Sequence, residues 1–277
     1  MYYKLLDWID IKKIKWSYLS MNPGAVHILE QNYDKIDWSN LSENPNAIHI
    51  LEQNLDKINW VMLSANPEAI HLLEQNLDKI DWYCLSGNPG AIHLLSEALE
   101  KNPDKIDWYG LSRNPGAIHI LEQNPDKIYW KYLSGNPGAI HLISEALEQN
   151  HDKIYWPWLL ENPGAIHILE QNPDKIDWDY LSLNPGAIHL LEQNSDKIDW
   201  DYLSANPSAI HILEQNPDKI NWFNLSNNPA IFTYDYDKIR AHCLIFKEDI
   251  MKNRFHPRNI PKFRDWGIDG FEDYEEE

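Results

Sequence analysis

The chain has 277 residues, of which 43 are acidic and 24 basic, and its formal net charge is −19. This charge argues against nucleic acid as a partner, because phosphate contacts need lysine and arginine. There is no apolar run long enough for a bilayer, no secretory signal pattern and no disulfide framework from Cys84 and Cys243, so we expect a reducing intracellular compartment and no membrane partner.

A tryptophan recurs within the motif K-I-x-W along most of the chain, and successive tryptophans are 22 residues apart except for two intervals of 26. A fixed period of this length predicts stacked units that bury a core only against their neighbours. We therefore expect an N-terminal cap at 1–12, a solenoid of about ten repeats at 13–241, and a C-terminal cap with an acidic tail at 242–277. The tryptophans are Trp16, Trp38, Trp60, Trp82, Trp108, Trp130, Trp156, Trp178, Trp200 and Trp222.

Each unit is predicted to contain two short helices. In NPGAIHLLEQN, residues 184–194, Asn184 is a favourable N-cap and Pro185 suits the first helical position. The apolar residues of 187–191 then share one face. The second half, NSDKIDWDYLSANP at 194–207, ends where the next proline stops a helix. This second helix has at most about two turns and can be partly 3₁₀.

Two units contain four extra residues, inserted after Leu95 and Ile143. Four residues are close to one helical turn, so we expect Leu99 and Leu147 to extend the same apolar face. The predicted fold is all-α, an α-solenoid of helix–turn–helix repeats of 22 or 26 residues. Ten layers at the usual helix spacing of 8–10 Å predict a curved rod on the order of 80–100 Å long.

Two positions vary freely between units, namely the first and the second residue after each tryptophan. Glycine, tryptophan and aspartate at equivalent sites are incompatible with a core, so both columns should line an exposed surface. That surface is a candidate for recognition, although drift without selection would give the same pattern. The candidate interaction residues are Tyr18, Met62, Tyr83, Tyr109, Tyr132, Trp158, Tyr180, Tyr202 and Phe223.

One histidine recurs in each of nine units. Zinc ligands must lie about 2.0–2.1 Å from the metal, but side chains one layer apart are attached roughly 10 Å apart. We therefore expect a structural ladder of hydrogen bonds to a neighbouring loop or carbonyl; the alternatives are a pH-sensitive row and, least favoured, a metal site. The tryptophans are likewise predicted to pack between layers. The histidines are His27, His49, His71, His93, His119, His141, His167, His189 and His211.

Chemistry-bearing motifs do not stand out from the repeat. The chain lacks a glycine-rich phosphate loop, a nucleophile elbow and a Cys–His pair outside the period, so we expect neither an enzyme nor a cofactor. A basic stretch at 238–264 has eight basic and two acidic residues, and an acidic end follows it. This stretch is interpreted as a solvated cap whose tail partly neutralises it.

The unit N-P-G-A-I-H-L-L-E-Q-N-P-D-K-I-D-W resembles repeats in proteins of giant nucleocytoplasmic DNA viruses of the marseillevirus and mimivirus type. The ending FHPRNIPKFRDWGID, residues 255–269, resembles their terminal segment, so that the resemblance covers about 13–269. It implies a viral protein made in the host cytoplasm, with packaging into the virion left open, and it carries over no activity. We expect a non-enzymatic scaffold for a host or viral protein partner. The alternatives are an elongated spacer in the virion and an acidic mimic of nucleic acid.

Overall fold

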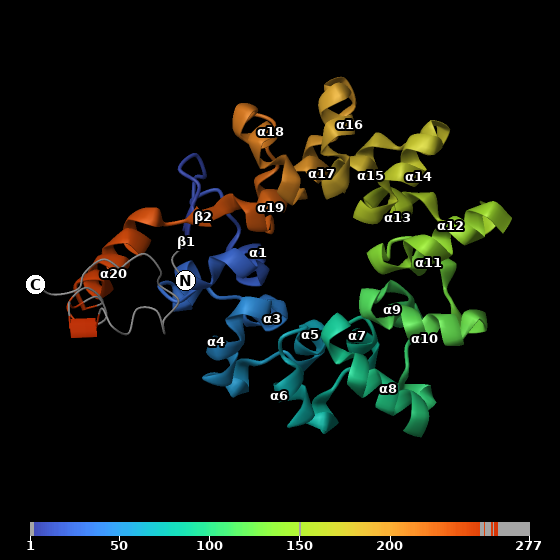
Figure 1. Ribbon diagram of the computed structural model, residues 1–277, viewed down its shortest axis with the longest axis horizontal. Coiled ribbons are helices and arrows are strands. Elements are labelled where there is room, and N and C mark those ends of the chain that lie inside the picture. The colour runs from blue at the N-terminus through green and yellow to red at the C-terminus, as the bar shows by residue number, and fades with distance from the viewer. Residues whose placement is uncertain (1–2, 150, 250–251, 253–255, 257, 260–277) are drawn as a thin grey trace, which may run out of the picture. The chain divides into compact units, whose positions relative to one another are not determined.

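The computed structural model describes residues 3–149, 151–249, 252, 256 and 258–259. The chain divides into two compact units, one formed by Met1–Lys4 with Thr233–Glu277 and the other by Leu5–Phe232. The second unit, called the repeat unit below, contains all the tryptophan repeats. Its short helices in regular alternation confirm the predicted all-α solenoid (Figure 1).

Each repeat begins with a helix whose first residue is its tryptophan, and these helices lie on the inner side of the repeat unit (Figure 1). A second helix, on the outer side, contains the histidine. The inner helices are α1 (Trp16–Met21), α3 (Trp38–Glu43), α5 (Trp60–Ala65), α7 (Trp82–Ser86), α9 (Trp108–Arg113), α11 (Trp130–Leu133), α13 (Trp156–Glu161), α15 (Trp178–Leu183), α17 (Trp200–Ala205) and α19 (Trp222–Leu225). The outer helices are α2 (Val26–Leu29), α4 (Ile48–Glu52), α6 (Ile70–Glu74), α8 (Ile92–Lys101), α10 (Ile118–Gln123), α12 (Ile140–Gln149), α14 (Ile166–Gln171), α16 (Ile188–Gln193) and α18 (Ile210–Gln215).

Short 3₁₀ turns connect these helices, and their positions refine the prediction. Most Asn-Pro sequences start such a turn, for example Pro185–Ala187 before α16, and most P-D-K-type sequences form another, for example Ser195–Lys197 before α17. The 3₁₀ geometry therefore precedes most of the helices instead of forming part of them. Asn184 caps the first turn as expected, because its Oδ1 accepts a hydrogen bond from Gly186 N at 2.9 Å.

The four-residue insertions lengthen the outer helix, as predicted. Helices α8 and α12 have ten residues each, whereas α6 has five. The extra turn of α8 continues the buried side through Ala98, and Leu99 is half-buried against the core. The core itself lies between the inner and outer helices and consists mainly of leucine, isoleucine and alanine. None of the described helices is long and apolar enough to cross a membrane.

The asparagine of the Asn-Pro sequence that follows each inner helix joins its repeat to the preceding one. Asn44 is fully buried, and its side-chain amide donates hydrogen bonds to the carbonyls of Ser20 at 3.0 Å and Asn22 at 2.9 Å. Ser20 adds a third link, because its Oγ accepts a hydrogen bond from Asp37 N at 3.0 Å. The asparagine contacts recur with the same geometry at Asn66, Asn88, Asn114, Asn136, Asn162, Asn184, Asn206 and Asn228.

The same contacts join the first repeat to the last, so the repeat unit is a closed ring. The Asn22 amide donates to the carbonyls of Ser226 at 3.2 Å and Asn228 at 3.0 Å, and Lys15 N donates to Ser226 Oγ at 2.9 Å. Figure 1 shows α1 beside α19 at this closure. The expected curved rod is therefore wrong for Leu5–Phe232, because successive repeats turn in the same direction until the tenth meets the first.

The predicted boundaries of the solenoid also shift. The described part of the predicted N-terminal cap, residues 3–12, does not cover an open end: Ile9 is buried in the core and Leu6 N donates to Ile231 O at 2.9 Å. The tenth repeat has no outer helix, since its chain continues into strand β2 (Phe232–Tyr234), which pairs with β1 (Tyr3–Leu5), and then into helix α20 (Tyr236–Asp249). The basic stretch is described at 238–249, 252, 256 and 258–259, and all of the acidic tail lies outside the described residues.

Candidate interaction surface

One side of each inner helix faces away from the core. The third and fourth residues after the tryptophan are buried in every repeat, for example Leu41 and Ser42 at 0 % exposure. At about 100° per residue, the first, second and fifth residues after the tryptophan lie on the opposite side. These three positions, with the residue before the tryptophan, form what is called the inner face below.

The candidate residues all lie on the inner face and outside the core, with different exposure in the two columns. In the first column, Tyr83, Tyr109 and Phe223 are 65 %, 41 % and 46 % exposed. The second column is more covered by neighbouring repeats: Tyr202 is 40 % exposed, and Tyr18, Met62, Tyr132, Trp158 and Tyr180 are half-buried. The prediction of an exposed surface therefore holds best for the first column.

Five aromatic side chains form a continuous cluster over α9, α11 and α13, called the aromatic row below. Its members are Tyr109, Tyr129, Tyr132, Tyr155 and Trp158. Ring centroids are 3.8 Å apart for Tyr109 and Tyr129, 4.7 Å for Tyr132 and Trp158, and 5.8 Å for Tyr155 and Trp158. The Lys131 ammonium lies 4.7 Å from the Tyr155 ring and 5.4 Å from the Trp158 ring, so the chain supplies a cation to this row.

A separate tyrosine pair lies on the next two inner helices. Tyr180 of α15 and Tyr202 of α17 stack with centroids 6.2 Å apart and planes at 28°. Burial raises the pKa of Tyr180, and the charges of Tyr155, Tyr202, Asp177 and Glu161 add to this effect. The tyrosine pair therefore lies close to the carboxylates at the starts and ends of its neighbouring helices.

Charged groups two repeats apart interact across the inner face. Burial raises the pKa of Glu161, and Arg113 partly offsets this effect from α9. Burial also raises the pKa of the Cys84 thiol to about 11, with contributions from Asp81 and from Glu43 at the end of α3. Such interactions over an intervening repeat are expected where the surface is concave.

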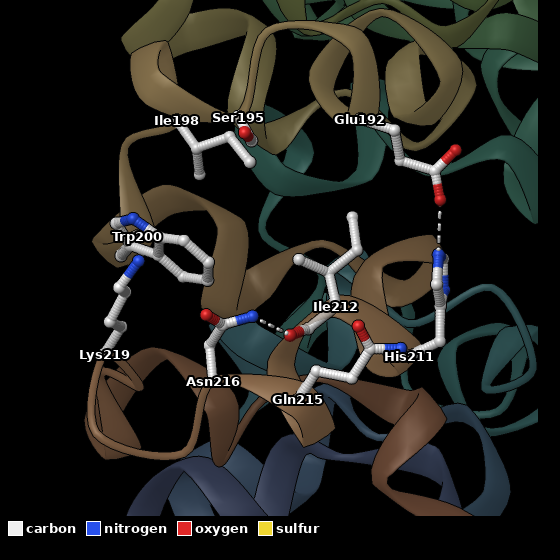
Figure 2. A pocket seen from close by; sticks show the side chains of 9 residues that line it. All are labelled: Glu192, Ser195, Ile198, Trp200, His211, Ile212, Gln215, Asn216 and Lys219. Carbon is white, nitrogen blue, oxygen red and sulfur yellow. Dashed lines mark hydrogen bonds and ion pairs between the residues drawn. The ribbon is translucent and has the colours of Figure 1, made fainter.

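The histidine ladder lies on the outer side and links consecutive repeats through carboxylates. His211 Nε2 lies 2.9 Å from Glu192 Oε1, and both side chains are about half exposed (Figure 2). The same pairing joins His49 to Glu30, His71 to Glu52, His93 to Glu74, His141 to Glu122 and His189 to Glu170. The expected partner, a loop or carbonyl, is therefore wrong: the partner is the glutamate three residues after the preceding histidine.

At three places the histidine has no such glutamate in the preceding repeat, and the sequence explains each case. Serine replaces this glutamate in both long helices, at Ser96 before His119 and at Ser144 before His167. At the ring closure the tenth repeat has no outer helix, and His27 instead meets Phe232 edge-on with centroids 5.8 Å apart. The histidines thus follow the repeat frame and do not converge on one another.

The tryptophans pack against the core and are half-buried, and a lysine of the next repeat covers most of the rings. Lys219 Nζ lies 4.2 Å from the Trp200 ring, beside a pocket of about 370 Å³ between α16 and α18 (Figure 2). At the closure, Lys13 covers Trp222 at 4.7 Å. The same contact covers Trp16, Trp38, Trp60, Trp82, Trp130 and Trp178 at distances from 4.3 to 4.9 Å.

Within the described part of the chain, no group of three or more histidine, cysteine, aspartate or glutamate side chains could hold a metal ion. No protein family model matches the chain, and neither a curated protein nor a solved structure matches it. Function is therefore inferred from the chemistry of the two sides of the ring. The outer side repeats the same contacts, whereas the inner face differs from repeat to repeat.

Proposed function

We propose that the protein is a non-enzymatic ring scaffold that binds a segment of another protein on its inner face. The observation that carries this proposal is the aromatic row, in which Tyr109, Tyr129 and Tyr155 remain 41 %, 39 % and 37 % exposed. Tyrosine and tryptophan are enriched at the centres of protein interfaces, because they bury a large area at little cost in conformational entropy. Contiguous exposed aromatic rings are uncommon on a surface without a partner.

The frame under the row supports the same proposal. Buried asparagines join each repeat to its neighbour through identical bonds, and closure leaves no free repeat to fray. A surface held this rigidly loses little conformational entropy when it binds, which favours affinity. The residues that differ between repeats lie on the inner face, so the frame and the recognition residues are separate.

The partner is proposed to be a host or viral protein, and the protein to be made in the host cytoplasm, in line with the resemblance to giant-virus repeat proteins. Packaging into the virion is a further proposal on the same basis. The alternative function of an elongated spacer is not supported, because the repeats form a ring. The nucleic-acid mimic is less favoured, because the distinguishing groups of the inner face are aromatic.

Affinity capture from infected cells tests the proposal. The tagged protein is compared with a variant carrying Tyr109→Ser, Tyr132→Ser and Trp158→Ser, and captured proteins are quantified by mass spectrometry. The matched control carries Leu55→Ser and Leu77→Ser, which remove apolar side chains that are 54 % and 58 % exposed away from the inner face. We expect the inner-face variant alone to lose its specific partners while its circular dichroism spectrum is unchanged. Equal capture by all three proteins would overturn the proposal.

A further inference from the structure

The tyrosine pair lacks the covering cation that most of the repeat tryptophans have. A lysine lies over most of the repeat tryptophans, and Lys131 lies over Tyr155 and Trp158 in the aromatic row. Among the described residues, no lysine or arginine lies over Tyr180 or Tyr202. The two rings pack against each other, as Tyr18 and Phe223 do elsewhere on the inner face, and what sets them apart is the charge of the positions beside them.

Carboxylates take the place of that cation. The residue after the tryptophan is Lys131 in α11, but it is Asp179 in α15 and Asp201 in α17, and both aspartates are exposed. Asp177 and Asp199 precede the same tryptophans, and each caps its helix through Oδ1, at 3.1 Å from Asp179 N and 2.8 Å from Tyr202 N. Four carboxylates thus occupy inner-face positions beside the two tyrosines, and these positions contain no basic residue in the two repeats. Asp201 also accepts a hydrogen bond from Asn221 Nδ2 at 2.9 Å through its Oδ1, which leaves its Oδ2 for a ligand.

This combination fits one kind of side chain best. A guanidinium group is planar and stacks on aromatic rings, and its N–H groups bind carboxylates in a fork geometry that an ammonium group cannot form. Phosphate is repelled by the same four carboxylates, which excludes nucleic acid as the occupant. The adjoining aromatic row provides apolar contacts for the rest of a peptide, so the occupant should be part of an extended chain.

We infer that the inner face at α15 and α17 binds an arginine side chain of a basic protein segment, with the guanidinium over Tyr180 and Tyr202 and bonded to Asp179 and Asp201. This inference rests on the proposed function and names the chemistry of its partner. The aromatic row lies next to the site along the ring, and the segment continues onto it. Charge complementarity also makes the association sensitive to salt.

Fluorescence anisotropy with defined peptides tests the inference. The probe is a labelled Gly-Ser peptide containing several arginines, compared with peptides of the same length in which lysine or neutral citrulline replaces arginine. We expect binding in the order arginine, lysine, citrulline, with citrulline at least about tenfold weaker than arginine. Equal affinities for arginine and citrulline, or for arginine and lysine, would overturn the assignment of a guanidinium site.

Variants locate the site. Asp179→Asn with Asp201→Asn should weaken the arginine peptide by about tenfold, and Tyr180→Leu with Tyr202→Leu should do the same without changing the net charge. The matched control, Asp196→Asn with Asp218→Asn, removes two exposed charges outside the inner face and should leave the affinity nearly unchanged. Equal weakening by the two aspartate pairs would indicate unspecific attraction to an acidic protein and overturn the inference. If the arginine peptide does not bind while the aromatic-row variant still loses partners from infected cells, the inference fails and the proposed function stands.

Discussion

Replacing Asn22 by alanine should destabilise the protein as much as breaking any internal contact between repeats. The Asn22 amide is fully buried and bonds to the carbonyls of Ser226 and Asn228 across the closure, and its Oδ1 accepts a hydrogen bond from Gly24 N at 3.0 Å. Alanine leaves two buried carbonyl oxygens without this donor, at about 1–2 kcal/mol each. The half-buried Gly24 N–H adds little, so we expect a loss of about 2–4 kcal/mol in the free energy of unfolding.

Urea unfolding followed by circular dichroism measures this loss as a shift in midpoint at unchanged slope. Asn44→Ala, which breaks the equivalent contact between the first and second repeats, should give the same shift within error. Asn46→Ala is the matched control, because its exposed amide also donates to a carbonyl of the preceding repeat, Pro23 O at 3.0 Å, and should cost less than about 1 kcal/mol. A small effect at Asn22 together with a full effect at Asn44 would refute closure of the ring in solution.

Three further predictions concern single side chains of the repeat unit. Lys57→Gln removes an ammonium 4.3 Å from the tryptophan ring of the preceding repeat and should lower the free energy of unfolding by about 0.5–1 kcal/mol; Lys127→Gln, at a lysine 3.9 Å from its neighbouring carboxylate, should have a smaller effect. Burial raises the pKa of Glu43, so the folded state holds its proton more tightly, and stability falls as pH rises from the ordinary carboxyl value of 4.5 through the raised pKa of the folded state. Glu43→Gln should therefore raise the urea midpoint at neutral pH, with no gain at pH values well below 4.5, and a neutral-pH loss would contradict the sign. Because the pKa of Cys84 is about 11, iodoacetamide should alkylate Cys84 more slowly than exposed Cys243 at about pH 8.5, a difference that must vanish in urea.

Local features of the fold could be predicted because the repeat itself displays them. Helix starts are marked by Asn-Pro, and the four-residue insertions identify α8 and α12 as helical by their length alone. Closure could not be predicted in this way. It depends on the small rotation between neighbouring repeats, which is set by backbone contacts such as those of Asn44, and a slightly different rotation would leave the same sequence pattern as an open array.

The two sides of the ring differ in how far the sequence reveals them. A comparison of the units reveals the variable columns. It does not identify Tyr129 and Tyr155 as interaction residues, because they occupy a capping position that is Asp or Asn in most repeats. The sequence also shows a glutamate three residues after most of the outer histidines, for example Glu192 after His189. This glutamate, however, bonds to the histidine of the next repeat, His211. Contacts between units, unlike contacts within a helix, need the stacking register before they can be read from a sequence.

Closure also restricts how the number of repeats can change during evolution. An open solenoid gains or loses a unit at its ends, or by unequal duplication, with a cost limited to one interface. In this ring the rotations between neighbouring repeats must add up to one full turn. The insertion or loss of one unit would therefore change the angle between repeats at every asparagine contact. Such a protein is therefore expected to vary by substitutions on its inner face and by insertions that lengthen an outer helix. The insertions in α8 and α12 are of this kind, because they leave the ring intact.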